Sequence, residues 1–196
     1  MRHDTNTMYE QTEARHILQH LSTALQQTGI DSAVSDARCI LGIVLGRDDA
    51  VMPHEIIACL RPDQNCQLED LLRRRQTGEP ISRLRGWREF WSMRFEVSPE
   101  TLDPRSDSET LIEAATVWGR HHTPSARILD LGAGSGCLLL ACLAELGQAT
   151  GVGIDISAGA VNVAVANALR HGLSNRARFC QFDFAADLRV HGQFDL

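Results

Sequence analysis

Three glycines at alternate positions have the spacing of a turn that could bind a ligand. Gly132, Gly134 and Gly136 follow a short apolar run at 127–131 and precede a long small-and-apolar segment at 138–146. The pattern predicts a buried strand, a glycine-rich turn and the start of a helix, which together can hold a nucleotide-like ligand on a parallel α/β sheet. The glycines would permit a tight turn, close approach of backbone to ligand, and close packing of helix on strand.

Acidic residues follow the strands that this sheet would contain. Asp155 ends an expected second strand at 151–155, and Asp183 follows an expected third strand at about 177–182. An acid about 20 residues after a glycine turn is placed to hydrogen-bond a ribose diol. Because ligands bind at the carboxyl ends of parallel strands, we expect Asp130, Asp155 and Asp183 to face one crevice.

A small helical bundle is expected upstream of the sheet, because apolar residues recur there at helical spacing. Four short helices in about eighty residues make a natural partner-recognition domain. Arg73, Arg74 and Arg75 could form a nucleic-acid patch, but we favour a solvated helix end that complements the helix dipole. The expected helices span residues 9–27, 35–45, 53–60 and 67–76.

A β-hairpin is expected at 87–97, where aromatic and charged residues alternate. Trp87 and Trp91 could form a stacking platform for a ligand, although the core of a two-stranded ribbon is the favoured interpretation. Ser106 or Ser108 can then cap a helix at 110–118. A polar link at 121–126 leads into the central strand.

The composition bounds the class of protein. The 196 residues carry a net charge of −6, and the isoelectric point is near 5.7, which argues against a broad nucleic-acid-binding face. The chain starts without a secretory signal and has no apolar run long enough to span a bilayer, so we expect a cytoplasmic protein. The six cysteines lack a C-x-x-C pair and are expected to be free and mostly buried. The histidines lack metal-ligand spacing, so no metal site is expected.

Four segments stand out: Gly78-Glu-Pro-Ile81, Arg88-Glu-Phe-Trp91, Pro104-Arg-Ser-Asp-Ser-Glu109 and Asp130-Leu-Gly-Ala-Gly-Ser-Gly136. In order and spacing they resemble the HemK-type peptide chain release factor glutamine N5-methyltransferases. The D-x-G-x-G-x-G pattern is similar to the first motif of methyltransferases that use S-adenosylmethionine (SAM). The NAD fingerprint differs, because its third glycine comes one residue later. The glycine motif alone names only the cofactor, and the other three segments narrow the resemblance to this family.

The resemblance implies an α/β fold: the first half of a Rossmann-like SAM-dependent methyltransferase sheet, preceded by a small helical bundle and a β-hairpin. The implied domains are a substrate-recognition domain at 1–80, a hairpin linker at 81–100 and a SAM-binding domain at 101–196. The implied acceptor is the glutamine of the Gly-Gly-Gln motif of class-1 release factors, which the helical domain helps to grip. Arg105 would lie near the cofactor. Position by position, Gly132, Ala133, Gly134, Ser135 and Gly136 would lie along the methionine and ribose of SAM, Asp155 would bind the ribose hydroxyls, and Asp183 and Phe184 would flank the adenine.

The sequence departs from the family pattern in two places. The loop that usually reads Ile-Pro-Arg-Pro is Asp103-Pro-Arg-Ser106 here. The family's catalytic Asn-Pro-Pro-Tyr follows a fourth strand that pairs with residues 128–131, and this chain stops at 193–196, where that strand would begin. We therefore name no catalytic residue and expect the 196-residue chain to be an incomplete enzyme that is inactive by itself.

Other functions stay open at this point. An adenine amino-methyltransferase acting on nucleic acid uses a related catalytic loop, although the acidic isoelectric point and the segments at 78–81 and 104–109 speak against it. A SAM-binding or partner-binding fragment without turnover is an alternative of another class. An NAD dehydrogenase is disfavoured by the glycine spacing. We expect a monomer that binds release factors and neither nucleic acid nor membranes.

Overall fold

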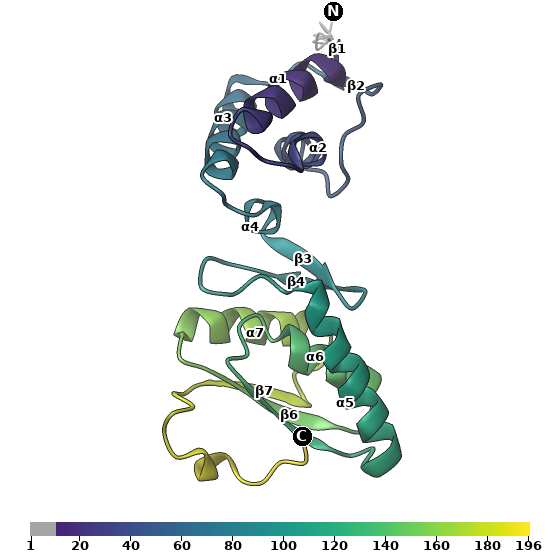
Figure 1. Cartoon of the computed structure of the whole chain (residues 1–196), viewed down its shortest axis with the longest axis vertical. Helices are drawn as coiled ribbons and strands as arrows, with labels where there is room; N and C mark the ends of the chain where they lie inside the picture. The colour runs from purple at the N-terminus through teal and green to yellow at the C-terminus, as the bar shows by residue number, and fades with distance from the viewer. Residues whose placement is uncertain (1–10) are drawn as a thin grey trace, which may run out of the picture. The chain divides into compact units, whose positions relative to one another are not determined.

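The computed structural model describes residues 11–196, which form two compact units that divide between Arg85 and Gly86. Figure 1 labels the elements of each unit. The first unit is largely helical, and the second contains a hairpin, a parallel sheet and its helices. The finer division of the second unit into a hairpin linker and a SAM-binding domain stays a prediction.

The helical unit is built from three helices of about three to four turns and one short helix. Their inward faces meet in one core, in which Leu21, Leu25, Ile40 and Leu41 are fully buried. The helix expected at 35–45 is confirmed. The one expected at 67–76 begins a turn earlier, because proline suits the first position of a helix, where its missing N–H is not needed. The helices are α1 (Ala14–Gln26), α2 (Ala33–Val44), α3 (Pro62–Gln76) and α4 (Ile81–Arg85).

The helix expected at 53–60 is wrong. This segment contains the strand β2 (Ile56–Ala58), which pairs antiparallel with β1 (Gln11–Glu13). The buried Ile57 lies between exposed neighbours, which is the alternation of a strand with one buried face. The strand β1 also replaces the first residues of the helix expected at 9–27, whose first two positions lie outside the described residues.

The arginine run at the end of α3 forms a set of ion pairs, which favours a structural role for these residues; that they do not bind nucleic acid stays a prediction. Arg74 contacts Glu79 at 2.6 Å and Arg75 contacts Asp36 at 2.8 Å, while Arg73 pairs with Asp70 one turn earlier. Gly78 follows the helix with a φ of 95°, a left-handed conformation that favours glycine.

The predicted hairpin is confirmed as β3 (Trp87–Phe90) and β4 (Met93–Glu96). Its two-residue turn places Trp91 and Ser92 at φ values of 52° and 55°, where residues other than glycine are strained. Two carboxylates hold Trp91 there. Its backbone N–H donates to Glu109 at 3.0 Å, and its indole N–H donates to Glu145 at 2.9 Å. The tryptophan therefore anchors the hairpin to the helices beneath it.

Three parallel strands form the sheet in the order β5-β6-β7. In Figure 1, α6 and α7 lie between the hairpin and the sheet. The apolar side chains of α6, including the fully buried Leu140 and Leu143, fill the core. Ser108 precedes α5 as expected, but its side chain makes no capping hydrogen bond. The elements are η1 (Ser106–Ser108), α5 (Glu109–His122), β5 (Arg127–Leu131), α6 (Cys137–Glu145), β6 (Thr150–Asp155), α7 (Ala158–Arg170), β7 (Ala177–Gln181) and η2 (Leu188–His191).

The last residues of the chain run along β5. The N–H of Leu129 donates to the carbonyl of Leu196 at 2.8 Å, and the N–H of Asp195 donates to the carbonyl of Arg127 at 2.8 Å. This is the neighbour that the sequence predicts for a fourth strand. Beside it, α5, α6 and β5 border an apolar groove of about 550 Å³, lined in part by Leu111, Trp118, Leu138 and Leu196.

All six cysteines are free, as expected, but only Cys137 and Cys142 are buried. The expectation that most are buried is wrong, because Cys59 and Cys66 lie on the exposed surface of the helical unit. No helix among residues 11–196 is long and apolar enough to cross a membrane.

Candidate cofactor site

The glycine turn between β5 and α6 has the backbone that only glycine adopts readily. Gly132, Gly134 and Gly136 have φ values of 76°, 55° and 77°. A Cβ at Gly136 would meet the ring of Phe179 at 2.8 Å and Ala164 at 3.1 Å, so this glycine lets α6 pack closely on the sheet. A Cβ at Gly132 would meet no atom within 4 Å. The turn is therefore crowded at its end and open at its beginning.

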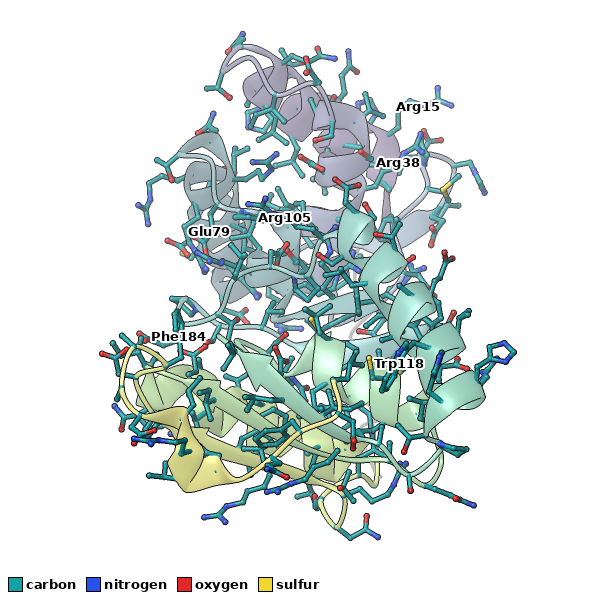
Figure 2. All side chains as sticks on the ribbon, turned by 60° about the horizontal axis from the view of Figure 1, so that its bottom comes forward. Arg15, Arg38, Glu79, Arg105, Trp118 and Phe184 are labelled. Carbon is teal, nitrogen blue, oxygen red and sulfur yellow. The ribbon has the colours of Figure 1, made fainter. Side chains whose placement is uncertain are left out.

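A pocket of about 280 Å³ lies against the open part of this turn. The segment before α5 forms its other wall and brings Arg105 to the rim, where the side chain is exposed (Figure 2). The start of α6 closes the end of the pocket, and the first N–H groups of a helix favour negative charge. The lining residues are Leu102, Asp103, Pro104, Arg105, Ser108, Gly132, Ala133, Gly134, Ser135, Cys137 and Leu138.

Asp155, at the end of β6, is bound to the glycine turn. One of its carboxylate oxygens accepts the N–H of Gly134 at 2.9 Å, and the other accepts the N–H of Ser157 at 2.9 Å. A carboxylate has about four acceptor positions, so these bonds leave capacity for hydroxyl groups. The acid is thus next to the turn, as expected, and its contact with a ribose stays a prediction.

Asp183 and Phe184 follow β7 and do not line the pocket. Asp183 is exposed and accepts the N–H of Ala185 at 2.9 Å, and Phe184 is 53% exposed (Figure 2). The same segment is tied to the second strand, because the N–H of Phe182 donates to the carbonyl of Asp155 at 2.8 Å. Their roles beside an adenine stay predictions.

None of the three acids expected to face one crevice lines this pocket, so that arrangement stays a prediction, and Asp130 lines a different groove. Its side chain lies among the apolar residues between β5, α5 and α6, because it lines the groove that contains Leu138 and Leu196. Its Oδ2 is buried and has no hydrogen-bond partner among the described residues. Burial raises the pKa of Asp130 to about 6. The charge of Asp155 adds to the rise, and the backbone N–H of Leu139 opposes it.

Asn167 is a site residue that sequence reasoning missed. It is fully buried on α7, and its Oδ1 accepts the N–H of Glu96 at 2.7 Å. Its Nδ2 donates to the carbonyl of Glu96 at 3.0 Å and to that of Ser135 at 2.9 Å. One amide therefore joins the hairpin to the glycine turn. The signal in the sequence is a lone asparagine on a buried helical face that otherwise holds Ala160, Ala164 and Ala168.

No group of three or more His, Cys, Asp and Glu side chains in the described part of the chain could hold a metal ion. The N–H groups of the glycine turn and of the start of α6 suit an anionic group, and the carboxylate at the end of β6 suits hydroxyl groups. That they bind one ligand stays a prediction.

The fold and this site define a methyltransferase domain, and residues 122–196 match the family model of that description. Residues 16–86 match the model of the PrmC N-terminal domain. The chain is 44% identical over 174 residues to the release factor glutamine methyltransferase of Rhodospirillum rubrum, a match that covers 88% of this chain and 52% of that protein. It is 38% identical over 178 residues to that of Bradyrhizobium diazoefficiens, covering 90% of this chain and 59% of that protein.

The resemblance to release factor glutamine methyltransferases is thereby confirmed, and residues 122–196 belong to the methyltransferase class of domain. The chain spans 52% and 59% of the length of these two relatives. Among solved structures, an RNA methyltransferase from Salinibacter ruber in complex with S-adenosyl-L-homocysteine is 30% identical, with a TM-score of 0.38 over 45% of this chain and 54% of that chain.

Proposed function

We propose that the pocket at the glycine turn binds SAM, and that the protein methylates the side-chain amide of the glutamine in the Gly-Gly-Gln motif of class-1 release factors. The observation that carries this proposal is the presence, in one chain, of a PrmC N-terminal domain at 16–86 and a methyltransferase domain with the glycine turn. The relatives' names supply the substrate class.

The residues of this chain fit the groups that SAM presents. The methionine carboxylate is matched by the N–H groups of the open turn from Gly132 and by the start of α6. The ribose hydroxyls are matched by the free acceptor positions of Asp155, and the exposed ring of Phe184 offers a face for the adenine. When bound, SAM supplies an electrophilic methyl group on its sulfonium sulfur.

This chain's own contribution to the reaction is then to hold SAM and to orient its methyl group. Asp155 on β6 fixes the turn through Gly134, and Asn167 on α7 fixes it through Ser135, so one strand and one helix hold the same loop. An amide nitrogen is a poor nucleophile, because its lone pair is delocalised into the carbonyl. Positioning is therefore the main source of rate for such a transfer.

The proposal assigns roles to the domains. Residues 1–80 recognise the release factor, and residues 101–196 hold SAM. The hairpin segment at 81–100 links these two domains. The protein acts as a monomer in the cytoplasm and binds neither nucleic acid nor a membrane directly. The dense ion pairing of the arginines at 73–75 supports the absence of a nucleic-acid patch.

The first test is calorimetric titration of the full chain with SAM. Gly134→Val places a β-branched side chain at a φ of 55° and is expected to weaken binding by at least about tenfold. Gly147→Ala is the matched control, because a Cβ there meets no atom within 4 Å and the residue does not line the pocket. A wild-type chain that binds no SAM refutes the cofactor assignment.

The second test is titration with an unmethylated class-1 release factor. The wild-type chain is expected to bind the release factor more tightly than an unrelated protein of similar charge. Equal affinity for the two proteins would refute the substrate assignment.

A further inference from the structure

A groove of about 260 Å³ lies on the helical unit between α1 and α2. Its residues on α1 recur at positions 15, 18, 19 and 22, and those on α2 at 34 and 38, so each helix contributes one face. Figure 2 shows Arg15 and Arg38 on the same side of this unit. The lining residues are Arg15, Leu18, Gln19, Ser22, Val34, Arg38 and Pro53.

The two arginines of the groove differ from the others on this unit. Arg47 contacts Glu55 at 2.6 Å, and α3 shows the same pattern, with each arginine of its last turn held by a carboxylate. Within residues 11–196, by contrast, neither Arg15 nor Arg38 has a carboxylate within ion-pair distance. The groove is therefore a local positive site on a chain whose net charge is −6.

The guanidinium of Arg38 is also partly desolvated. Its Nε is buried and has no hydrogen-bond partner among the described residues. A buried donor without an acceptor is unfavourable, and a guanidinium is shaped to bind a carboxylate with two parallel hydrogen bonds. An incoming carboxylate would satisfy this donor, because the Nε and one Nη form one edge of the fork.

The apolar part of the groove indicates a peptide as the occupant. Leu18 forms a buried floor, and Val34 is 49% exposed beside it, so an apolar side chain could pack where the carboxylate binds. A nucleic acid needs a longer row of cations and aromatic side chains on which bases stack. This groove has two arginines and no aromatic residue in its lining.

We propose that the groove between α1 and α2 binds an acidic peptide segment, in which a carboxylate next to an apolar residue reaches Arg38 and Arg15. The inference deepens the proposed function and rests on it in one respect: the segment belongs to the release factor that is methylated. The groove then holds the substrate through contacts that do not involve its glutamine.

The test uses fluorescence anisotropy with the full chain and a fluorescein-labelled peptide of alternating leucine and glutamate. A peptide of alternating leucine and lysine is the charge control. We expect the acidic peptide to bind and the basic one not to bind. Arg38→Ala should weaken binding by about tenfold, because hydrogen bonds to charged groups are the strong ones. Arg38→Lys should retain part of the affinity, since it keeps the charge and loses the fork.

Arg73→Ala is the matched control variant. Arg73 is an exposed arginine of the same unit, paired only with Asp70 on its own helix, and its loss should leave peptide affinity within about twofold. Circular dichroism of each variant checks that it is folded, and Arg15→Ala repeats the test at an exposed position if Arg38→Ala is not.

Several results would overturn the proposal: equal binding of both peptides, unchanged affinity in both arginine variants, or displacement of the acidic peptide by a short RNA at lower concentration than by unlabelled peptide. Competition by an unmethylated release factor links the groove to the substrate. A release factor that binds the chain without displacing the peptide overturns that link. SAM titration of the same samples is independent of the groove, so a failure of the cofactor assignment is recognised separately.

Discussion

Replacing Asp130 by asparagine should change how the stability of the protein depends on pH. The carboxylate is buried among apolar residues, with one oxygen that lacks a hydrogen-bond partner among the described residues. Its pKa is raised from the ordinary 3.8 to about 6, mainly by burial. A raised pKa means that the folded protein disfavours the charged form. The protonated acid therefore contributes stability that is fully present below about pH 4 and is lost as the pH rises through about 6.

The magnitude follows from the two pKa values. Each unit by which folded and unfolded values differ corresponds to about 1.4 kcal/mol, so the wild-type protein should lose about 3 kcal/mol of unfolding free energy between pH 4 and pH 7.5 through this group. Asp130→Asn has no such dependence. The asparagine also buries N–H donors that have no evident acceptor, at a cost of about 1–3 kcal/mol that does not vary with pH. The quantity to measure is therefore how the difference in unfolding free energy between the two proteins changes with pH.

The assay is urea unfolding of both proteins at several values between pH 4 and pH 7.5. The stability of Asp130→Asn relative to wild type should rise by about 3 kcal/mol over this range. Asp187→Asn is the control, and its stability relative to wild type should stay nearly constant over this range. Hydrogen bonds from Arg189 lower the pKa of Asp187, so its contribution is present at neutral pH and is lost only as the pH falls into the acidic range. A relative change for Asp130→Asn below about 1 kcal/mol would refute the reasoning from burial.

Two further predictions follow from buried groups. Asn167→Ala leaves the N–H and carbonyl of Glu96 and the carbonyl of Ser135 without their partner, so it should destabilise the protein by about 2–4 kcal/mol in urea and speed hydrogen exchange at the Glu96 amide; unchanged exchange would contradict the bridge. Burial raises the pKa of the Cys137 and Cys142 thiols to about 11, so a thiol reagent at pH 8 should modify the exposed cysteines first and these two only on unfolding; early modification of either would contradict their burial.

The parts of the fold that local patterns determine could be predicted. The hairpin at 87–96 follows from strict alternation, and the glycine turn follows from three positions that need left-handed φ values. The segment at 53–60 has too few apolar residues to distinguish the 3.6-residue period of a helix from the two-residue period of a strand. What decides in favour of a strand is pairing with residues 11–13, some forty positions away. Such pairing leaves no local signal.

The parts of the site that depend on local backbone geometry could be predicted. The parts that depend on contacts with residues far away in the sequence could not. The acid that ends β6 was found because strand ends and glycine turns have fixed spacing. Asn167 was missed because its partners, Glu96 and Ser135, lie on two other elements. The surroundings of Asp130 depend on how α5 and α6 cover β5, which no local pattern in the sequence shows.

Asn167 and Asp130 show two outcomes of burying a polar side chain next to the same turn. Asn167 uses its amide fully, since its oxygen and nitrogen make three hydrogen bonds to backbone groups that would otherwise be buried without partners. Each such bond contributes about 1 kcal/mol. Asp130 leaves one oxygen without a partner, and its ionisation at neutral pH costs about 3 kcal/mol. The two energies are of similar size and opposite sign. The hairpin and α7 therefore stabilise the turn by about as much as the buried charge destabilises the strand end before it.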